Sequence, residues 1–86
     1  MSDFNHITGR QMAAARALLG MSQSDLSERT NVSVPTLRRM EASKGPITGY
    51  INNVRAVVAA LEAEGIVFVQ KGDLVTGQGI SFIDAD

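Results

Sequence analysis

Residues 21–41 constrain the fold of this 86-residue chain more strongly than any other stretch. Two short helical patterns flank a tight turn within it. Ser22 is a candidate N-cap and Asp25 follows three residues later, which is the spacing of a capping box. Asn31 stands where the turn requires a left-handed backbone, a conformation that Asn adopts more readily than most residues. The pattern therefore predicts a helix over residues 23–30 and a sharp turn after it.

The second half of this stretch predicts another helix, over residues 33–41. Ser33 is its candidate N-cap, and Pro35 falls in the first turn, where a missing N–H leaves no helical bond unmade. Leu37 and Met40 are three residues apart and share the face expected to be buried. The residues left on the outward side are Val34, Pro35, Thr36, Arg38 and Arg39. Two helices joined in this way form a helix-turn-helix, although capped helix pairs also occur in many other small helical domains.

Several separately spaced residues resemble the Cro and phage-repressor (Xre-type) helix-turn-helix family. They are Gln23, the small Ser27 four residues later, Val32 and Ser33 after the turn, and the run Arg38-Arg39-Met40-Glu41. The resemblance extends back to Arg16 and covers roughly residues 9–64. Ser27 stands where the family commonly has Ala, and Asn31 where it commonly has Gly. The resemblance implies a bacterial or phage DNA-binding protein.

We therefore expect a mainly α fold: a lambda-repressor-like helix-turn-helix bundle of four helices with a C-terminal β-hairpin, in a single domain over residues 1–86. The helices are expected at about 9–20, 23–30, 33–41 and 49–64, and residues 1–7 as an irregular arm. Thr48 and Asn52 could each cap the fourth helix. Its apolar stripe is expected to contain Ile47, Tyr50, Ile51, Val54, Val57, Val58 and Leu61. It would close a core of Met12, Leu19, Leu26, Val32, Leu37 and Met40.

Arg16 shares a helical face with apolar residues, so its charge requires a partner. In the family that this chain resembles, the arginine at this place pairs with the glutamate that closes the recognition helix. The resemblance thus implies a structural ion pair between Arg16 and Glu41, which excludes Arg16 from the DNA contacts.

The C-terminal part contains two β-rich runs, 66–70 and 79–83, joined by a segment with turn residues. They predict a hairpin over about 66–83. Its first strand is apolar on both faces, and an isolated hairpin is marginally stable in water. One face can pack on the fourth helix, and the other favours a second chain. The expected dimer interface contains Ile66, Val67, Phe68, Val69, Ile80 and Phe82. The alternative is a hairpin that packs only on its own domain.

The charge distribution is uneven, although the chain carries a net charge of only −1. Residues 1–48 hold six basic and four acidic side chains, and residues 49–86 hold two basic and five acidic ones. Positive charge therefore gathers around the helix-turn-helix. The acidic C-terminal half could limit non-specific DNA affinity, which depends on the number of phosphates neutralised.

If the second helix enters the major groove, residues near its N-terminus meet base edges. The resemblance assigns base reading to Val34, Pro35 and Arg39, with Arg38 beside them reaching a base or a phosphate. Arg39 could make the bidentate contact that arginine forms with guanine, whereas the apolar pair fits thymine methyl groups. The alternative for two adjacent arginines is a solvated face. Phosphate contacts are expected from Ser22, Gln23, Ser33, Thr36 and Lys44.

These features predict a sequence-specific DNA-binding transcriptional regulator, acting in the cytoplasm as a homodimer on a two-fold operator with half-sites roughly 34 Å apart. The alternative is an antitoxin or another protein-interaction module that binds DNA only to control its own expression. An enzyme is not expected, because the chain has one histidine (His6), no cysteine and no assembled catalytic or metal-binding set, and the acidic Asp84 and Asp86 form only a short tail. No cofactor, metal or membrane segment is expected.

Overall fold

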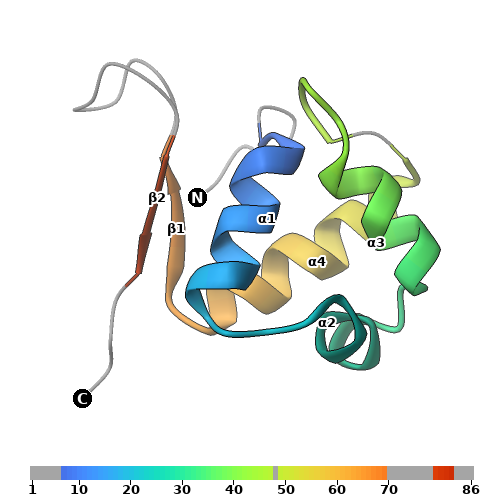
Figure 1. Cartoon of the computed structure of the whole chain (residues 1–86), viewed down its shortest axis with the longest axis horizontal. Helices are drawn as coiled ribbons and strands as arrows, with labels where there is room; N and C mark the ends of the chain where they lie inside the picture. Colours follow the sequence, from blue (N-terminus) through green and yellow to red (C-terminus); the bar gives the residue numbers. More distant parts are fainter. Residues whose placement is uncertain (1–6, 48, 70–78, 83–86) are drawn as a thin grey trace.

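The computed structural model describes residues 7–47, 49–69 and 79–82 (Figure 1). These residues form the helices α1 (Gly9–Leu18), α2 (Gln23–Thr30), α3 (Val34–Glu41) and α4 (Ile51–Ala63), followed by the strands β1 (Ile66–Val69) and β2 (Gly79–Phe82). The two strands pair in antiparallel register, Ile66 opposite Phe82 and Val69 opposite Gly79. The expected mainly α bundle with a C-terminal hairpin is therefore confirmed. None of the helices within these ranges has both the length and the apolar character that crossing a membrane requires.

The start of α4 differs from the expectation. Its N-cap is Tyr50, which makes no side-chain cap hydrogen bond, so Asn52 as a cap is wrong, and Thr48 lies outside the described residues. Gly49 has φ +133°, far from the helical value, and this backbone conformation prevents α4 from beginning earlier. Tyr50 is 83% exposed, and Ile51 is exposed as well. The apolar stripe of α4 therefore begins only at Val54.

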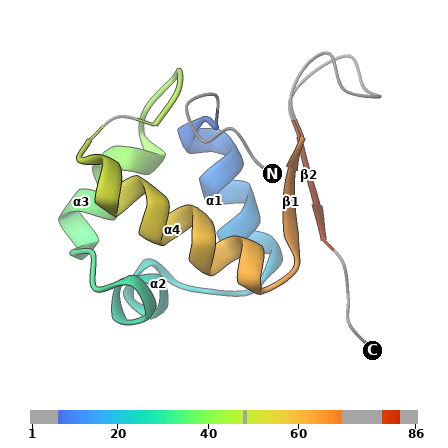
Figure 2. The same ribbon diagram turned by 180° about the vertical axis from the view of Figure 1, so that it is seen from behind.

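The core lies where α4 crosses the other three helices (Figure 2). Five of the six residues expected there from the first three helices and the turn are buried. Leu19 instead lies partly buried at the margin, because α1 ends at Leu18, two residues before the predicted end. The buried apolar residues are Ile7, Met12, Ala15, Leu26, Val32, Leu37, Met40, Ile47, Val54, Val57, Val58, Leu61, Ile66 and Phe68.

Residue 7 was expected in an irregular arm, but Ile7 is fully buried. The Ile47 N–H donates to the Ile7 carbonyl over 2.8 Å, so the start of the described chain pairs with the segment that leads to α4. Gly9 lies directly beneath the end of α3. A Cβ at this position would lie 2.5 Å from the Met40 carbonyl oxygen and 2.6 Å from that of Glu41. Only glycine therefore permits this approach of α1 to α3.

The hairpin packs on its own domain through one face. Ile66 and Phe68 are buried there, so they lie beneath any dimer interface and not in it, which corrects their sequence assignment. Val67 on the opposite face is 44% exposed. The buried Gln11 side chain of α1 donates from Nε2 to the carbonyls of Val69 and Gly79, both over 2.9 Å. Both views place the hairpin and α3 on opposite sides of the molecule (Figures 1 and 2).

Candidate nucleic-acid interface

The start of α2 is fixed by a reciprocal capping box. The Asp25 N–H donates to the Ser22 hydroxyl, and the Ser22 N–H donates to the Asp25 carboxylate, each over 3.0 Å. These bonds, first from the backbone and then from the side chain of Ser22, lower the pKa of Asp25. The carboxylate is therefore charged near neutral pH and interacts favourably with the positive end of the helix dipole.

The turn and the start of α3 follow the predicted chemistry. Asn31 has φ 62° and ψ 23°, the left-handed conformation, and Val32 beside it is buried. Ser33 caps α3 by accepting the Thr36 N–H, and Pro35 occupies the first turn. This geometry sets the axis of α3 relative to α2.

The inner side of α3 is closed by Leu37 and Met40, which are 0% and 1% exposed. Pro35, Arg38 and Arg39 are exposed on the other side, and Val34 is partly buried. Arg39 has a local partner, because its Nη2 donates to the Thr36 hydroxyl oxygen over 3.2 Å. Apart from this bond, the side of α3 that carries Arg38 and Arg39 is exposed to solvent.

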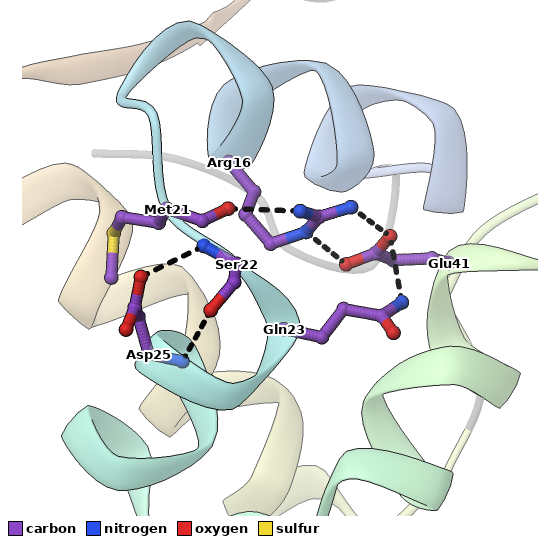
Figure 3. Close-up of polar contacts among 6 residues, drawn as sticks. All are labelled: Arg16, Met21, Ser22, Gln23, Asp25 and Glu41. Carbon is purple, nitrogen blue, oxygen red and sulfur yellow. Dashed lines mark hydrogen bonds and ion pairs between the residues drawn. The ribbon is translucent and has the colours of Figure 1, made fainter.

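Arg16 and Glu41 form the ion pair that the resemblance implied (Figure 3). Arg16 donates from Nε and Nη2 to the two carboxylate oxygens over 2.9 and 3.0 Å, and from Nη1 to the Met21 carbonyl over 2.8 Å. The bond to Glu41 raises the pKa of Arg16, although burial acts in the opposite direction. Gln23 adds a third donor to the same carboxylate over 3.3 Å. The cluster ties α1, α2 and the end of α3 together.

The residues predicted to contact phosphates do not form one uniform group. Ser22, Ser33 and Lys44 are exposed, whereas Gln23 and Thr36 are partly buried. The amide of Gln23 is engaged by Glu41, so it has one N–H left for a phosphate. Ser22 lies beside the charged carboxylate of Asp25, which would repel an anion.

Tyr50 and Asn53 are not among the site residues that the sequence predicts. With Gly49 and the α3 residues Thr36, Arg39 and Met40, they line a surface hollow of about 410 Å³ beside α3. Tyr50 was assigned instead to the apolar stripe of α4, because an aromatic residue at helical spacing looks the same in sequence whether it faces the core or the solvent. Within the described part of the chain, no three His, Cys, Asp or Glu side chains gather as a possible metal site; His6, Asp84 and Asp86 lie outside it.

A helix-turn-helix family model matches residues 12–51, a little under half of the chain. The match begins in α1 and ends at the first residue of α4, so it contains α2, the turn and α3. No curated protein matches the chain significantly. The matched segment, with its capped helix pair and its Arg16–Glu41 tie, belongs to the Cro/phage-repressor (Xre-type) helix-turn-helix family.

Proposed function

We propose that the chain is a sequence-specific DNA-binding transcriptional regulator that inserts α3 into the major groove. Membership of its helix-turn-helix segment in the Xre-type family supports DNA binding and regulation of transcription. The observation that carries the more specific proposal is the exposure of Arg38 and Arg39 on α3, opposite the buried Leu37 and Met40. A convex cationic helix fits a groove about 12 Å wide between two phosphate backbones.

The outward residues differ in what they can recognise. Arg39 presents several N–H donors and is proposed to bind a guanine edge, the commonest specific contact of arginine in the major groove. Val34 and Pro35 offer only apolar surface at the helix start, which suits a thymine methyl group. Arg38, exposed beside Arg39, is proposed to reach a base edge or a phosphate. Lys44 is proposed to contact the phosphate backbone, which contributes affinity and orientation but no sequence preference.

The test of base reading is a selection of bound fragments from a random duplex pool, followed by titration of the selected operator. Arg39→Ala should weaken operator binding by about 1–3 kcal/mol and remove the preference at one base pair. Lys44→Ala is the control, because loss of a phosphate contact should weaken binding to all duplexes alike. An Arg39→Ala protein that keeps the wild-type preference at every position would refute the role of Arg39.

We further propose that the chain acts as a homodimer joined through the outer face of the hairpin. The apolar Val67 is exposed there, and among residues 7–47, 49–69 and 79–82 no further strand pairs with the outer edge of β1 or β2. Because α3 and the hairpin lie on opposite sides of a molecule 34 Å long, chains joined end to end would place their α3 helices about two duplex turns apart. The expected one-turn spacing requires the two chains to meet at a steep angle.

The dimer is tested by replacing Val67 with Lys and measuring mass by light scattering and operator affinity by titration. The variant should be monomeric, should bind a single half-site as wild type does, and should lose affinity for the full operator. Ala59→Lys is the matched control, because Ala59 is an exposed apolar residue on α4 and not on the outer face of the hairpin. A wild-type chain that is monomeric on and off the operator would refute the proposal, and the selected half-site spacing would fix the angle.

A further inference from the structure

A short chain of hydrogen bonds runs along the outward side of α3. The Ser33 hydroxyl donates to the Thr36 hydroxyl oxygen over 2.9 Å, and Nη2 of Arg39 donates to the same oxygen over 3.2 Å. The three residues are spaced by three, so they follow one another on one helical face. Thr36 thus holds the guanidinium of Arg39 in place while being held by the cap residue.

This arrangement determines where the charge of Arg39 lies. The bond to Thr36 draws the guanidinium back over the preceding turn, toward the N-terminal half of α3. In a helix-turn-helix this half meets the base edges. An arginine side chain has five N–H donors, so four remain for a guanine edge or for solvent. The hollow beside α3, which both residues line, leaves room for other positions of the side chain if the bond is lost.

We propose that Thr36 is a positioning residue that sets the base preference of Arg39. The proposal rests on the DNA-binding function proposed above and gives Thr36 a different role from the phosphate contact predicted from the sequence. Its hydroxyl orders the guanidinium before DNA arrives, so less side-chain freedom is lost when the guanine contact forms.

The expected effect follows from the cost of ordering one long side chain at an interface. Thr36→Val keeps the shape and the backbone N–H that Ser33 caps, but removes the oxygen that accepts from Arg39. The ratio of affinities for the operator and for a duplex with the critical guanine replaced should fall roughly two- to tenfold. Thr36→Ser keeps the acceptor and should preserve most of the ratio. Thr36→Ala should lower the ratio as much as Thr36→Val does. Agreement between the two variants would show that the effect comes from loss of the hydroxyl oxygen and not from the shape of the valine side chain.

The decisive measurement is a double-mutant cycle between Thr36→Val and Arg39→Ala, titrated on both duplexes, with the unfolding midpoint of each variant recorded. A positioning role predicts that Thr36→Val changes the ratio in wild type and leaves it unchanged once Arg39 is absent. A direct phosphate contact predicts instead an equal loss on both duplexes in both backgrounds, and this result would overturn the proposal.

The two proposals fail in different ways. If Arg39→Ala loses its base preference while Thr36→Val keeps the full ratio, base reading by α3 stands and the role of Thr36 is refuted. If the wild-type chain prefers no duplex over any other, the proposed function is refuted, and the role of Thr36 with it.

Discussion

Glu41→Ala removes the acceptor on which three donors converge. Nε and Nη2 of Arg16 and Nε2 of Gln23 all donate to this carboxylate, over 2.9, 3.0 and 3.3 Å. The Glu41 side chain is 9% exposed and that of Arg16 is 21% exposed. The variant therefore leaves a guanidinium largely covered by protein, and the Met21 carbonyl is its one remaining hydrogen-bond partner among the described residues.

The magnitude follows from this partial burial. Removing one partner of a fully buried ion pair costs about 3–5 kcal/mol, because the other charge is left unpaired. Water reaches a fifth of the Arg16 side chain and replaces some of the lost bonding. We expect Glu41→Ala to lower the free energy of unfolding by about 2–3 kcal/mol. For a domain of this size that corresponds to a fall in Tm of roughly 8–24 °C.

The assay is thermal and urea unfolding followed by circular dichroism. Glu62→Ala is the matched control, because Glu62 is exposed on α4, and its replacement should change stability by less than about 0.5 kcal/mol. The double variant Arg16→Met/Glu41→Leu should recover most of the loss, since it removes both charges. If Glu41→Ala unfolds at the wild-type temperature, or the double variant is no more stable than the single one, the argument from an unpaired charge is wrong.

Three further predictions concern other parts of the structure. Gly9→Ala should destabilise the chain by about 1–3 kcal/mol in urea unfolding, because its Cβ would lie 2.5 Å from a carbonyl oxygen of α3, whereas Gly45→Ala, with no atom within 4 Å, should be tolerated. Asp25→Asn should be less stable than wild type at pH 7. Since folding lowers the pKa of Asp25, this difference is present above the ordinary carboxyl pKa of about 4 and is lost as the pH falls through the lowered value. The unfolding curves of the two proteins should therefore converge as the pH is lowered into the acid range. Gln11→Met should speed hydrogen exchange of the β1 amides more than that of α4, because two hairpin carbonyls lose their donor; equal rates in both proteins would show that the hairpin needs no such anchor.

The helix-turn-helix could be predicted from the sequence because its signals are local. Ser22 and Asp25, or Ser33 and Pro35, specify a helix start through bonds within four residues, and Asn31 specifies the turn through its own backbone preference. The capping bonds of these serines and the backbone preference of Asn31 depend on neighbouring residues in the sequence and hardly on the tertiary structure.

The start of α4 and the role of Ile7 could not be predicted in this way. Apolar residues at positions 47, 50 and 51 fit the helical spacing, but α4 begins only at Ile51, because the backbone at Gly49 is not helical. A glycine in the sequence does not by itself specify its φ. Burial of Ile7 depends on pairing with a segment forty residues later in the chain. Such contacts become visible only when the bundle has formed.

Several residues of the candidate site could be predicted from the sequence, but most of their hydrogen-bond partners could not. The sequence identified the outward side of α3 and, through the family resemblance, the Arg16–Glu41 pair. It did not reveal that Gln23 is drawn into this pair or that Arg39 is held by Thr36, because both contacts depend on side-chain orientation. The same limit applies to the hairpin, where the inward orientation of Phe68 becomes clear only from the register and the packing against α1 and α4.

The two ends of α3 are held by separate sets of contacts, which leaves its outward side free for the DNA contacts proposed above. A helix of eight residues is unstable alone in water, so its position must come from its surroundings. Ser33 caps the first turn, Glu41 ties the last turn to α1 and α2, and Leu37 and Met40 anchor the middle. None of these contacts uses the exposed residues of α3. Base preference could therefore change through the outward residues while the fold stays the same, whereas changes in the holding residues should alter stability and, with it, binding to every sequence.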